Sequence, residues 1–153
     1  MDYAGDGFKH HNGGGDNSSC VFPQISYLNE IYEEEPNAIF ILPFRNVKQW
    51  TQSISRWGTM GERITELCEF PEYNFTKGMG GKESELQELY CRHVKHIRQF
   101  VFQHPSLTLV EYSIEDDGAG DYLASLIPNL NASNYGHANA NPPPTKEKKM
   151  KTD

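Results

Sequence analysis

Arg45 and Ser53 are the pair of side chains in this sequence that best suits the binding of an anionic ligand. Arg45 follows an apolar run that closes with Pro43 and Phe44, and Ser53 comes eight positions later. A guanidinium offers a planar fork of donors that matches a phosphate dianion, and a serine hydroxyl adds another donor. Because ligands of open α/β sheets bind outside the carboxyl ends of strands, the pair predicts a phosphate site. Spacing alone also leaves a second interpretation open, in which Arg45 forms a surface ion pair.

A buried strand and a helix are the elements that would position this pair. The five residues of Ala38–Leu42 are all apolar and lie between turn formers, which is typical of a strand buried on both faces in a parallel sheet. Four apolar residues then follow one another at intervals of three or four positions, as on one face of a helix: Val47, Trp50, Ile54 and Trp57. This pattern predicts a helix from about Asn46 to Trp57 with Asn46 as its N-cap. The start of that helix would offer free N–H groups and the positive end of its dipole to a phosphate.

The remaining apolar pattern predicts four more helices and a second strand. The expected helices run from Pro23 to about Glu35, around Glu62–Glu69, from about Glu83 to Gln103 and from Ala119 to Ile127, and the second strand is Leu107–Ile114. Helices that alternate with buried strands imply an α/β fold with a partial parallel sheet flanked by helices. Two strands do not make a stable sheet alone, so we expect the complete fold to contain more strands.

Composition divides the chain into three segments. Residues 1–20 contain a Gly13–Gly15 run and are expected to be loop or disordered, and residues 131–153 form a Pro- and Lys-rich tail that is also expected to be disordered. Residues 21–130 carry the apolar pattern and form the predicted α/β domain.

Net charge argues against nucleic acid as the main partner, and hydropathy argues against a membrane span. The net charge of −7 argues against nucleic acid, since phosphate contacts along a duplex need clustered Lys and Arg. No apolar run approaches the roughly eighteen residues of a membrane span, so we expect no membrane segment in this chain.

The three cysteines, Cys20, Cys68 and Cys91, are too few and too scattered for a disulfide framework or a zinc site, and no metal ligand set is predicted. If one pair forms, Cys68 with Cys91 is the favoured pair, and three free thiols is the alternative. Three glycosylation sequons, at Asn17, Asn74 and Asn131, favour a lumenal setting only weakly, so Golgi lumen and cytoplasm both stay open.

The segment Pro36–Ser53, PNAIFILPFRNVKQWTQS, resembles the part of the sulfotransferase superfamily that holds the 3′-phosphate of 3′-phosphoadenosine 5′-phosphosulfate. In that family a strand of the form P-x-A-x-F-I-L leads to Arg, then Asp or Asn, then Trp, with Ser eight residues after the Arg. Arg45 and Ser53 match those two positions, so the resemblance implies that they bind the 3′-phosphate of this cofactor.

A second block supports the same resemblance. Tyr90 and His93 match the family's Tyr-x-x-His helix, and Leu107–Tyr112 is similar to the strand that follows it. The likeness covers roughly Phe22–Ile127 and is nearest to the algal and carbohydrate-type members. It implies a P-loop NTPase-like fold, of which this chain would be the C-terminal part.

The sequence differs from the family pattern at the phosphosulfate-binding loop and at the catalytic residues. The family opens with a strand, a glycine- and lysine-bearing loop and a helix that cradle the 5′-phosphosulfate. Gly13–Gly15 follows no predicted strand and is not followed by Lys, so we reject it as that loop. His10 and His11 lie in a glycine-rich stretch, and His93 and His96 lie on the long helix, where a structural role is favoured for His93. No catalytic residue is therefore assigned.

Two functions follow as expectations. The first is a fragment of a sulfotransferase that transfers a sulfuryl group from 3′-phosphoadenosine 5′-phosphosulfate to a hydroxyl or amine of a small-molecule or carbohydrate acceptor. The alternative is a non-catalytic truncated paralogue that acts as a binding or interaction protein, its missing strands leaving an open sheet edge. A P-loop kinase relative would need the same absent loop.

Overall fold

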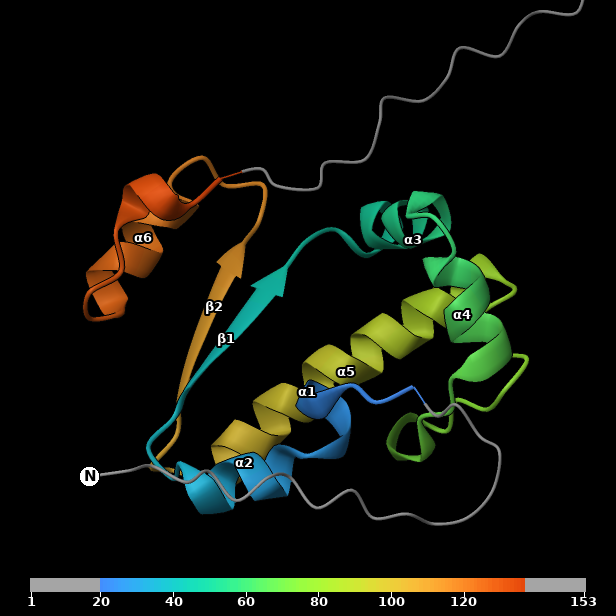
Figure 1. The fold of residues 1–153 in the computed structure, drawn as a ribbon, viewed down its shortest axis with the longest axis horizontal. Helices are drawn as coiled ribbons and strands as arrows, with labels where there is room; N and C mark the ends of the chain where they lie inside the picture. Colours follow the sequence, from blue (N-terminus) through green and yellow to red (C-terminus); the bar gives the residue numbers. More distant parts are fainter. Residues whose placement is uncertain (1–19, 137–153) are drawn as a thin grey trace, which may run out of the picture.

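The computed structural model describes residues 20–136, which form an α/β fold (Figure 1). Strand β1 (Ile39–Phe44) pairs in parallel with β2 (Thr108–Ser113), in a register that runs from Ile39 opposite Thr108 to Phe44 opposite Ser113. The predicted partial parallel sheet flanked by helices is confirmed. Of the segments expected to be disordered, residues 1–20 and 131–153, the structure describes only Cys20 and residues 131–136, which include a 3₁₀ turn at Ala132–Asn134. The rest of both segments lies outside the described residues, as do His10, His11, Asn17 and Gly13–Gly15.

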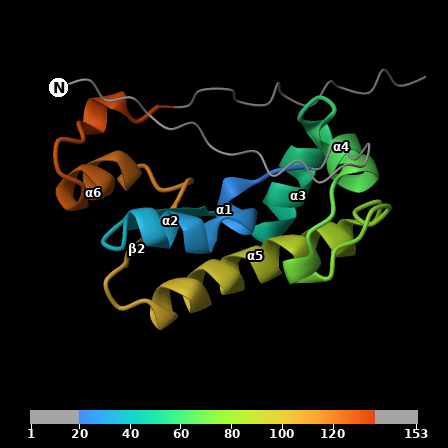
Figure 2. The ribbon, with the colours of Figure 1, turned by 60° about the horizontal axis from the view of Figure 1, so that its bottom comes forward.

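Helices surround this small sheet. Their bounds are α1 Pro23–Ser26, α2 Leu28–Glu34, α3 Val47–Arg56, α4 Met60–Leu67, α5 Glu83–Gln103 and α6 Ala119–Leu126, with short 3₁₀ turns η1 at Pro71–Tyr73 and η2 at Ala132–Asn134. The long helix α5 runs along one side of the molecule beneath α1, α2 and α3, whereas α6 lies beside β2 at the opposite end from α3 and α4 (Figures 1 and 2). None of the helices in residues 20–136 combines the length and the apolar character that crossing a membrane requires.

The predicted helix from Pro23 to Glu35 is interrupted at Tyr27. Pro23 begins α1 as expected, but Tyr27 leaves helical geometry, with φ −130° and ψ 31°, before α2 begins at Leu28. The break redirects the two apolar residues on either side, because Ile25 and Leu28 are buried in different clusters. A continuous helix would have sent both side chains along a single face.

Two clusters of buried residues form the core, and α5 contributes to both. The first cluster contains Ile25, Ile54, Ile64, Cys68, Phe70, Tyr73, Phe75, Leu86 and Leu89. The second cluster contains Leu28, Leu42, Ile97, Phe100 and Leu107. The core is therefore divided along α5, with α3 and α4 over one half and the sheet and α2 over the other.

The expectation that the first strand is buried on both faces is wrong. Leu42 is buried in the second cluster, but the side chains of Ile39 and Ile41 are 41% and 47% exposed. Within residues 20–136, β1 has only β2 as a strand neighbour. The apolar run predicted the strand correctly, and the layers that would cover its second face and second edge are not supplied by these residues.

The expected pairing of Cys68 with Cys91 is also wrong. Cys20 and Cys68 form a disulfide with a Cα–Cα distance of 5.0 Å, and Cys91 is an exposed free thiol on α5. The bond ties the segment before α1 to the end of α4, across a separation of 48 residues. The structure therefore pairs Cys68 with the cysteine that is more distant in sequence.

Candidate functional site

Asn46 ends the turn after β1 and caps α3, as its position predicted. Its side-chain Oδ1 accepts hydrogen bonds from the backbone N–H groups of Lys48, at 3.0 Å, and Gln49, at 3.4 Å. Two donors of the first helical turn are therefore already used within the protein. The expectation that the helix start offers free N–H groups does not hold for this pair, and recognition of an anion here falls mainly to side chains.

Arg45 is held at the end of β1 by a tyrosine from α5. The hydroxyl of Tyr90 accepts a hydrogen bond from the Arg45 N–H at 3.1 Å and donates to the Arg45 carbonyl at 3.2 Å. The Tyr90 ring also packs against Trp50 of α3, with ring centroids 5.0 Å apart. One side chain thus fixes the backbone of Arg45 against both neighbouring helices.

The Arg45 guanidinium is only partly satisfied by the protein. Its Nη2 lies 3.0 Å from Oε1 of Glu115, a residue just beyond β2, so the surface ion-pair interpretation accounts for one nitrogen. The Nε of Arg45 is buried and has no hydrogen-bond partner. A buried donor without a partner is costly, and it identifies a position where an additional acceptor would be stabilised.

Ser53 lies one helical turn beyond Gln49, the residue of α3 that reaches this ion pair. The amide of Gln49, oriented with its nitrogen toward the loop after β2, donates to Oε2 of Glu115 at 3.1 Å. Ser53 follows Gln49 by four residues, which places it one turn further along the same face, about 6 Å along the helix axis. Arg45, Glu115 and Gln49 therefore meet at one point, and Ser53 is partly buried on the next turn.

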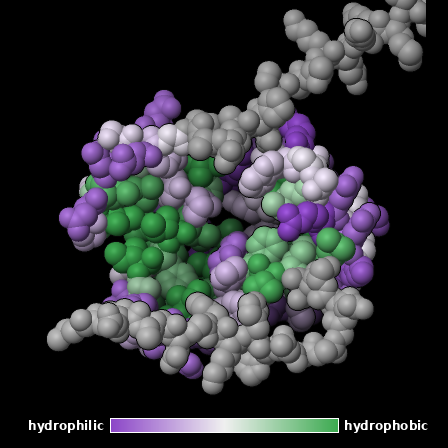
Figure 3. All heavy atoms as spheres, in the orientation of Figure 1, coloured by the Kyte–Doolittle hydropathy of each residue, from purple (hydrophilic) through white to green (hydrophobic). Residues whose placement is uncertain are grey.

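An apolar groove of about 620 Å³ opens beside Arg45. It runs between β1 and the helices α1, α3, α4 and α5, and its few polar members include Arg45, Tyr90 and His93. Figure 3 shows a hollow near the middle of this face, with apolar residues along one side of it. The sequence analysis did not predict this groove. Its only signal in the sequence was the high density of Phe, Trp and Ile residues around positions 40–57.

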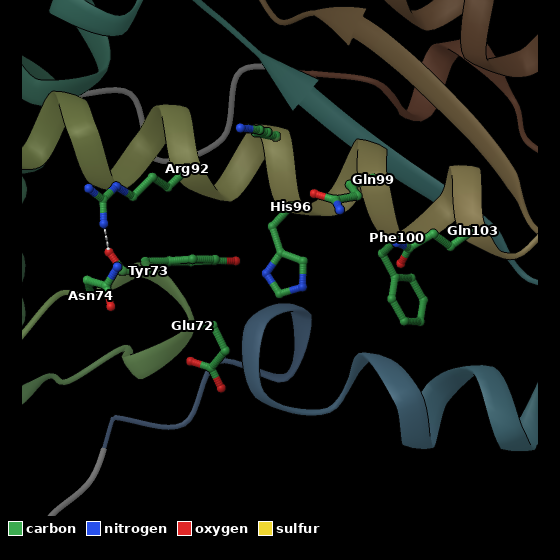
Figure 4. A pocket seen from close by; sticks show the side chains of 9 residues that line it. Glu72, Tyr73, Asn74, Arg92, His96, Gln99, Phe100 and Gln103 are labelled. Carbon is green, nitrogen blue, oxygen red and sulfur yellow. Dashed lines mark hydrogen bonds between the residues drawn. The ribbon is translucent and has the colours of Figure 1, made fainter.

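His93 contacts a second, more polar pocket through Tyr73. The Tyr73 hydroxyl lies 3.0 Å from His93 Nδ1, and Tyr73 lines a pocket of about 420 Å³ between η1 and α5 (Figure 4). Burial raises the pKa of the Tyr73 phenol, and the nearby Glu72 carboxylate raises it further. Burial also lowers the pKa of His93, with a smaller contribution from His96. Both groups are therefore neutral near pH 7.

The wall of this pocket carries charges of both signs. Arg92 and His96 project from α5 toward the η1 turn, where Glu72 and Asn74 lie, and Lys95 also lines the pocket (Figure 4). Arg92 is already engaged, since it pairs with Glu88 at 2.7 Å and donates to the carbonyl of Tyr73. We find no preference for a ligand class in this arrangement, and the histidine–tyrosine contact joins α5 to η1 as a structural link.

The described residues bring no group of three or more His, Cys, Asp or Glu side chains together in a way that could hold a metal ion. In comparisons with known proteins, no family model, curated protein or solved structure matches this chain.

Proposed function

We propose that this chain is the cofactor-binding part of a sulfotransferase, in which Arg45 and Ser53 hold the 3′-phosphate of 3′-phosphoadenosine 5′-phosphosulfate. When bound, this cofactor would supply the sulfuryl group for a hydroxyl or amine of a small-molecule or carbohydrate acceptor. The observation that carries the proposal is the buried Nε of Arg45, a donor without a partner just beyond the carboxyl end of β1.

The local chemistry suits a phosphate better than it suits a neutral ligand. A guanidinium that is partly buried needs an anionic partner, and Glu115 supplies one through a single nitrogen. A phosphate has more acceptor oxygens than one carboxylate contact uses, so it would reach Nε as well. Ser53 would add a hydroxyl donor from the next turn of α3. Because these contacts do not change as sulfur is transferred, they would set affinity rather than rate.

The described residues fit the 3′-phosphate and not the 5′-phosphosulfate. Each strand leads to a helix through a short turn: Arg45 and Asn46 follow β1, and Ile114–Gly118 follow β2. Neither turn contains a lysine, and the second is acidic, with Glu115, Asp116 and Asp117 in succession. In this proposal the groups that act on the sulfuryl centre come from outside residues 20–136, and none of those residues is assigned a catalytic role.

A calorimetric titration with two nucleotides tests the proposal. 3′-Phosphoadenosine 5′-phosphate should bind at least tenfold more tightly than adenosine 5′-phosphate, because the two differ only in the phosphate that Arg45 and Ser53 would contact. Equal affinities, or no heat from either nucleotide, would contradict the assignment of the site.

A second candidate function is a non-catalytic protein that binds a partner. The observation that favours it is the open side of β1, where two isoleucines are exposed next to an apolar groove. Exposed apolar surface of this kind marks interaction sites in soluble domains. The nucleotide titration separates the two candidates, since a purely interacting protein has no reason to distinguish a 3′-phosphate.

A further inference from the structure

The free edge of β1 presents a defined set of backbone groups. The Ala38 and Phe44 carbonyls accept from Thr108 and Ile114, so even-numbered residues of this strand direct their N–H and C=O groups at β2. Backbone direction alternates along a strand, and the odd-numbered Ile39, Ile41 and Pro43 therefore point to the other side. Since Pro43 has no N–H, the edge offers N–H and C=O of both isoleucines and the carbonyl of Pro43.

The apolar groove runs along this same edge. Six consecutive residues, Phe40–Arg45, line it. Side chains of successive residues point to opposite faces of a sheet, so a cavity over one face would be lined by alternate residues only. A groove that touches all six lies beside the strand, where the next strand of a sheet would be.

We propose that the free edge of β1 and its groove bind an extended apolar segment of a partner polypeptide, which pairs with Ile39 and Ile41 as a third strand. Strand addition of this kind takes affinity from main-chain hydrogen bonds and specificity from pockets for alternate side chains. Here the helices supply those pockets, through Ile25 of α1, Trp50 and Ile54 of α3 and Val94 of α5. The inference does not depend on the nucleotide site.

The enclosure of the groove decides what kind of occupant fits. Helices wall it along its length, and its other side is the strand itself. A second copy of this chain would bring its own α5 along with its own β1, whereas a single extended segment brings only its side chains. The length of the edge, six residues, sets the segment at about 20 Å.

The parts of this chain outside the described residues do not supply such a segment. Apart from Pro142–Pro144, which have no N–H groups to pair with a strand, residues 1–19 and 137–153 contain no run of three consecutive apolar residues. A strand that enters this groove is apolar on both faces, as strands covered on both sides are. The occupant is therefore assigned to an extended apolar segment outside these 153 residues.

Intrinsic fluorescence gives a direct measurement, because both tryptophans of the chain, Trp50 and Trp57, line the groove. The probe is an eight-residue peptide of alternating valine and isoleucine with a lysine at each end. We expect a saturable shift of the tryptophan emission and at least tenfold slower hydrogen exchange at the Ile39 and Ile41 amides. The matched control is the same peptide with an N-methyl group on every residue, which has no backbone N–H to donate at either edge and should not bind.

Two variants sharpen the test. Ile41→Pro removes only an N–H that points away from β2, and Ile41→Lys places a charge at the edge, so both should weaken binding at least tenfold. Leu67→Lys, at a similarly exposed residue of α4 away from the groove, should leave binding unchanged. Three results would overturn the inference: equal binding of the methylated peptide, no binding of the parent peptide, or protection of Ile39 and Ile41 in a dimer without peptide.

Discussion

The hydroxyl of Tyr90 bonds to both polar backbone atoms of Arg45, at 3.1 Å from its nitrogen and 3.2 Å from its carbonyl oxygen. Tyr90 lies on α5, 45 residues away along the chain, so this contact couples the end of β1 to the longest helix of the fold. The backbone of Arg45 is thus held in place by α5, and at the proposed site this would reduce the entropy lost on binding.

Replacing Tyr90 by Phe should loosen Arg45 without disturbing the packing of the ring. We expect the free energy of unfolding to fall by about 1–3 kcal/mol, because two partly buried hydrogen bonds are lost. The affinity for 3′-phosphoadenosine 5′-phosphate should fall as well. Urea unfolding and calorimetry measure the two effects, with Tyr122→Phe, at an exposed position of α6, as the control. Wild-type nucleotide affinity in a destabilised Tyr90→Phe protein would show that the clamp does not serve the site.

Removing the guanidinium should abolish recognition of the 3′-phosphate. Each charge-assisted hydrogen bond contributes about 1.5–3 kcal/mol, so Arg45→Ala should weaken binding of 3′-phosphoadenosine 5′-phosphate at least tenfold to a hundredfold. Ser53→Ala should give a smaller loss. Arg98→Ala removes the same charge and a comparable ion pair, that with Glu111 at 2.8 Å, and should bind normally. Unchanged affinity in Arg45→Ala removes the site assignment.

Glu115 should compete with the phosphate for Arg45. Its carboxylate occupies Nη2 of the guanidinium and adds negative charge where an anion would bind. We expect Glu115→Gln to bind 3′-phosphoadenosine 5′-phosphate several-fold more tightly, and to lose no more than about 1 kcal/mol of stability, as is usual for a partly exposed ion pair. A titration at two salt concentrations checks the charge effect. Weaker binding in this variant would instead make Glu115 a residue that positions Arg45.

Local sequence signals predicted most of the elements correctly. The bounds of α5 match the prediction at Glu83 and Gln103, because an apolar stripe defines the helix and His104–Pro105 ends it. The N-cap at Asn46 was also predicted correctly, because an asparagine side chain can accept hydrogen bonds from the first N–H groups of the helix that follows it. Both features depend on residues within a few positions of each other, which is the range over which propensity and capping act.

Contacts between distant residues could not be predicted in the same way. The pairing of Cys20 with Cys68, the ion pair of Arg45 with Glu115 and the exposure of Ile41 all depend on how elements pack. The residues of that ion pair are 70 positions apart. At the candidate site, sequence therefore named Arg45 and Ser53, but it predicted neither the contact of Tyr90 with Arg45 nor the position of Glu115. Binding of a phosphate by the first pair stays a prediction.

The disulfide should stabilise the first core cluster. Closing a loop of 48 residues is worth about 4 kcal/mol in the chain-entropy model. Cys20→Ser and Cys68→Ser should therefore each lower the free energy of unfolding by a few kcal/mol, and the double variant should lose little more than either single one. Cys91→Ser should have no such effect, since its thiol is exposed and free. Thermal unfolding with and without reductant measures this. A large loss in Cys91→Ser would contradict the pairing.

Buried His93 should make the fold sensitive to acid. Its pKa is lowered in the folded protein, chiefly by burial, so below the ordinary histidine pKa of about 6.5 the unfolded chain binds a proton that the folded protein does not. Stability should then fall as pH decreases from about 6.5, until the pH passes below the folded-state pKa. His93→Asn keeps a polar group near Tyr73 but cannot titrate, so the slope of unfolding free energy against pH should flatten. Tyr73→Phe should lose about 1 kcal/mol at every pH and keep the slope, because burial rather than this hydrogen bond causes the shift. Equal slopes in wild type and His93→Asn, measured by urea unfolding between pH 7.5 and pH 4.5, would assign the acid sensitivity to other groups.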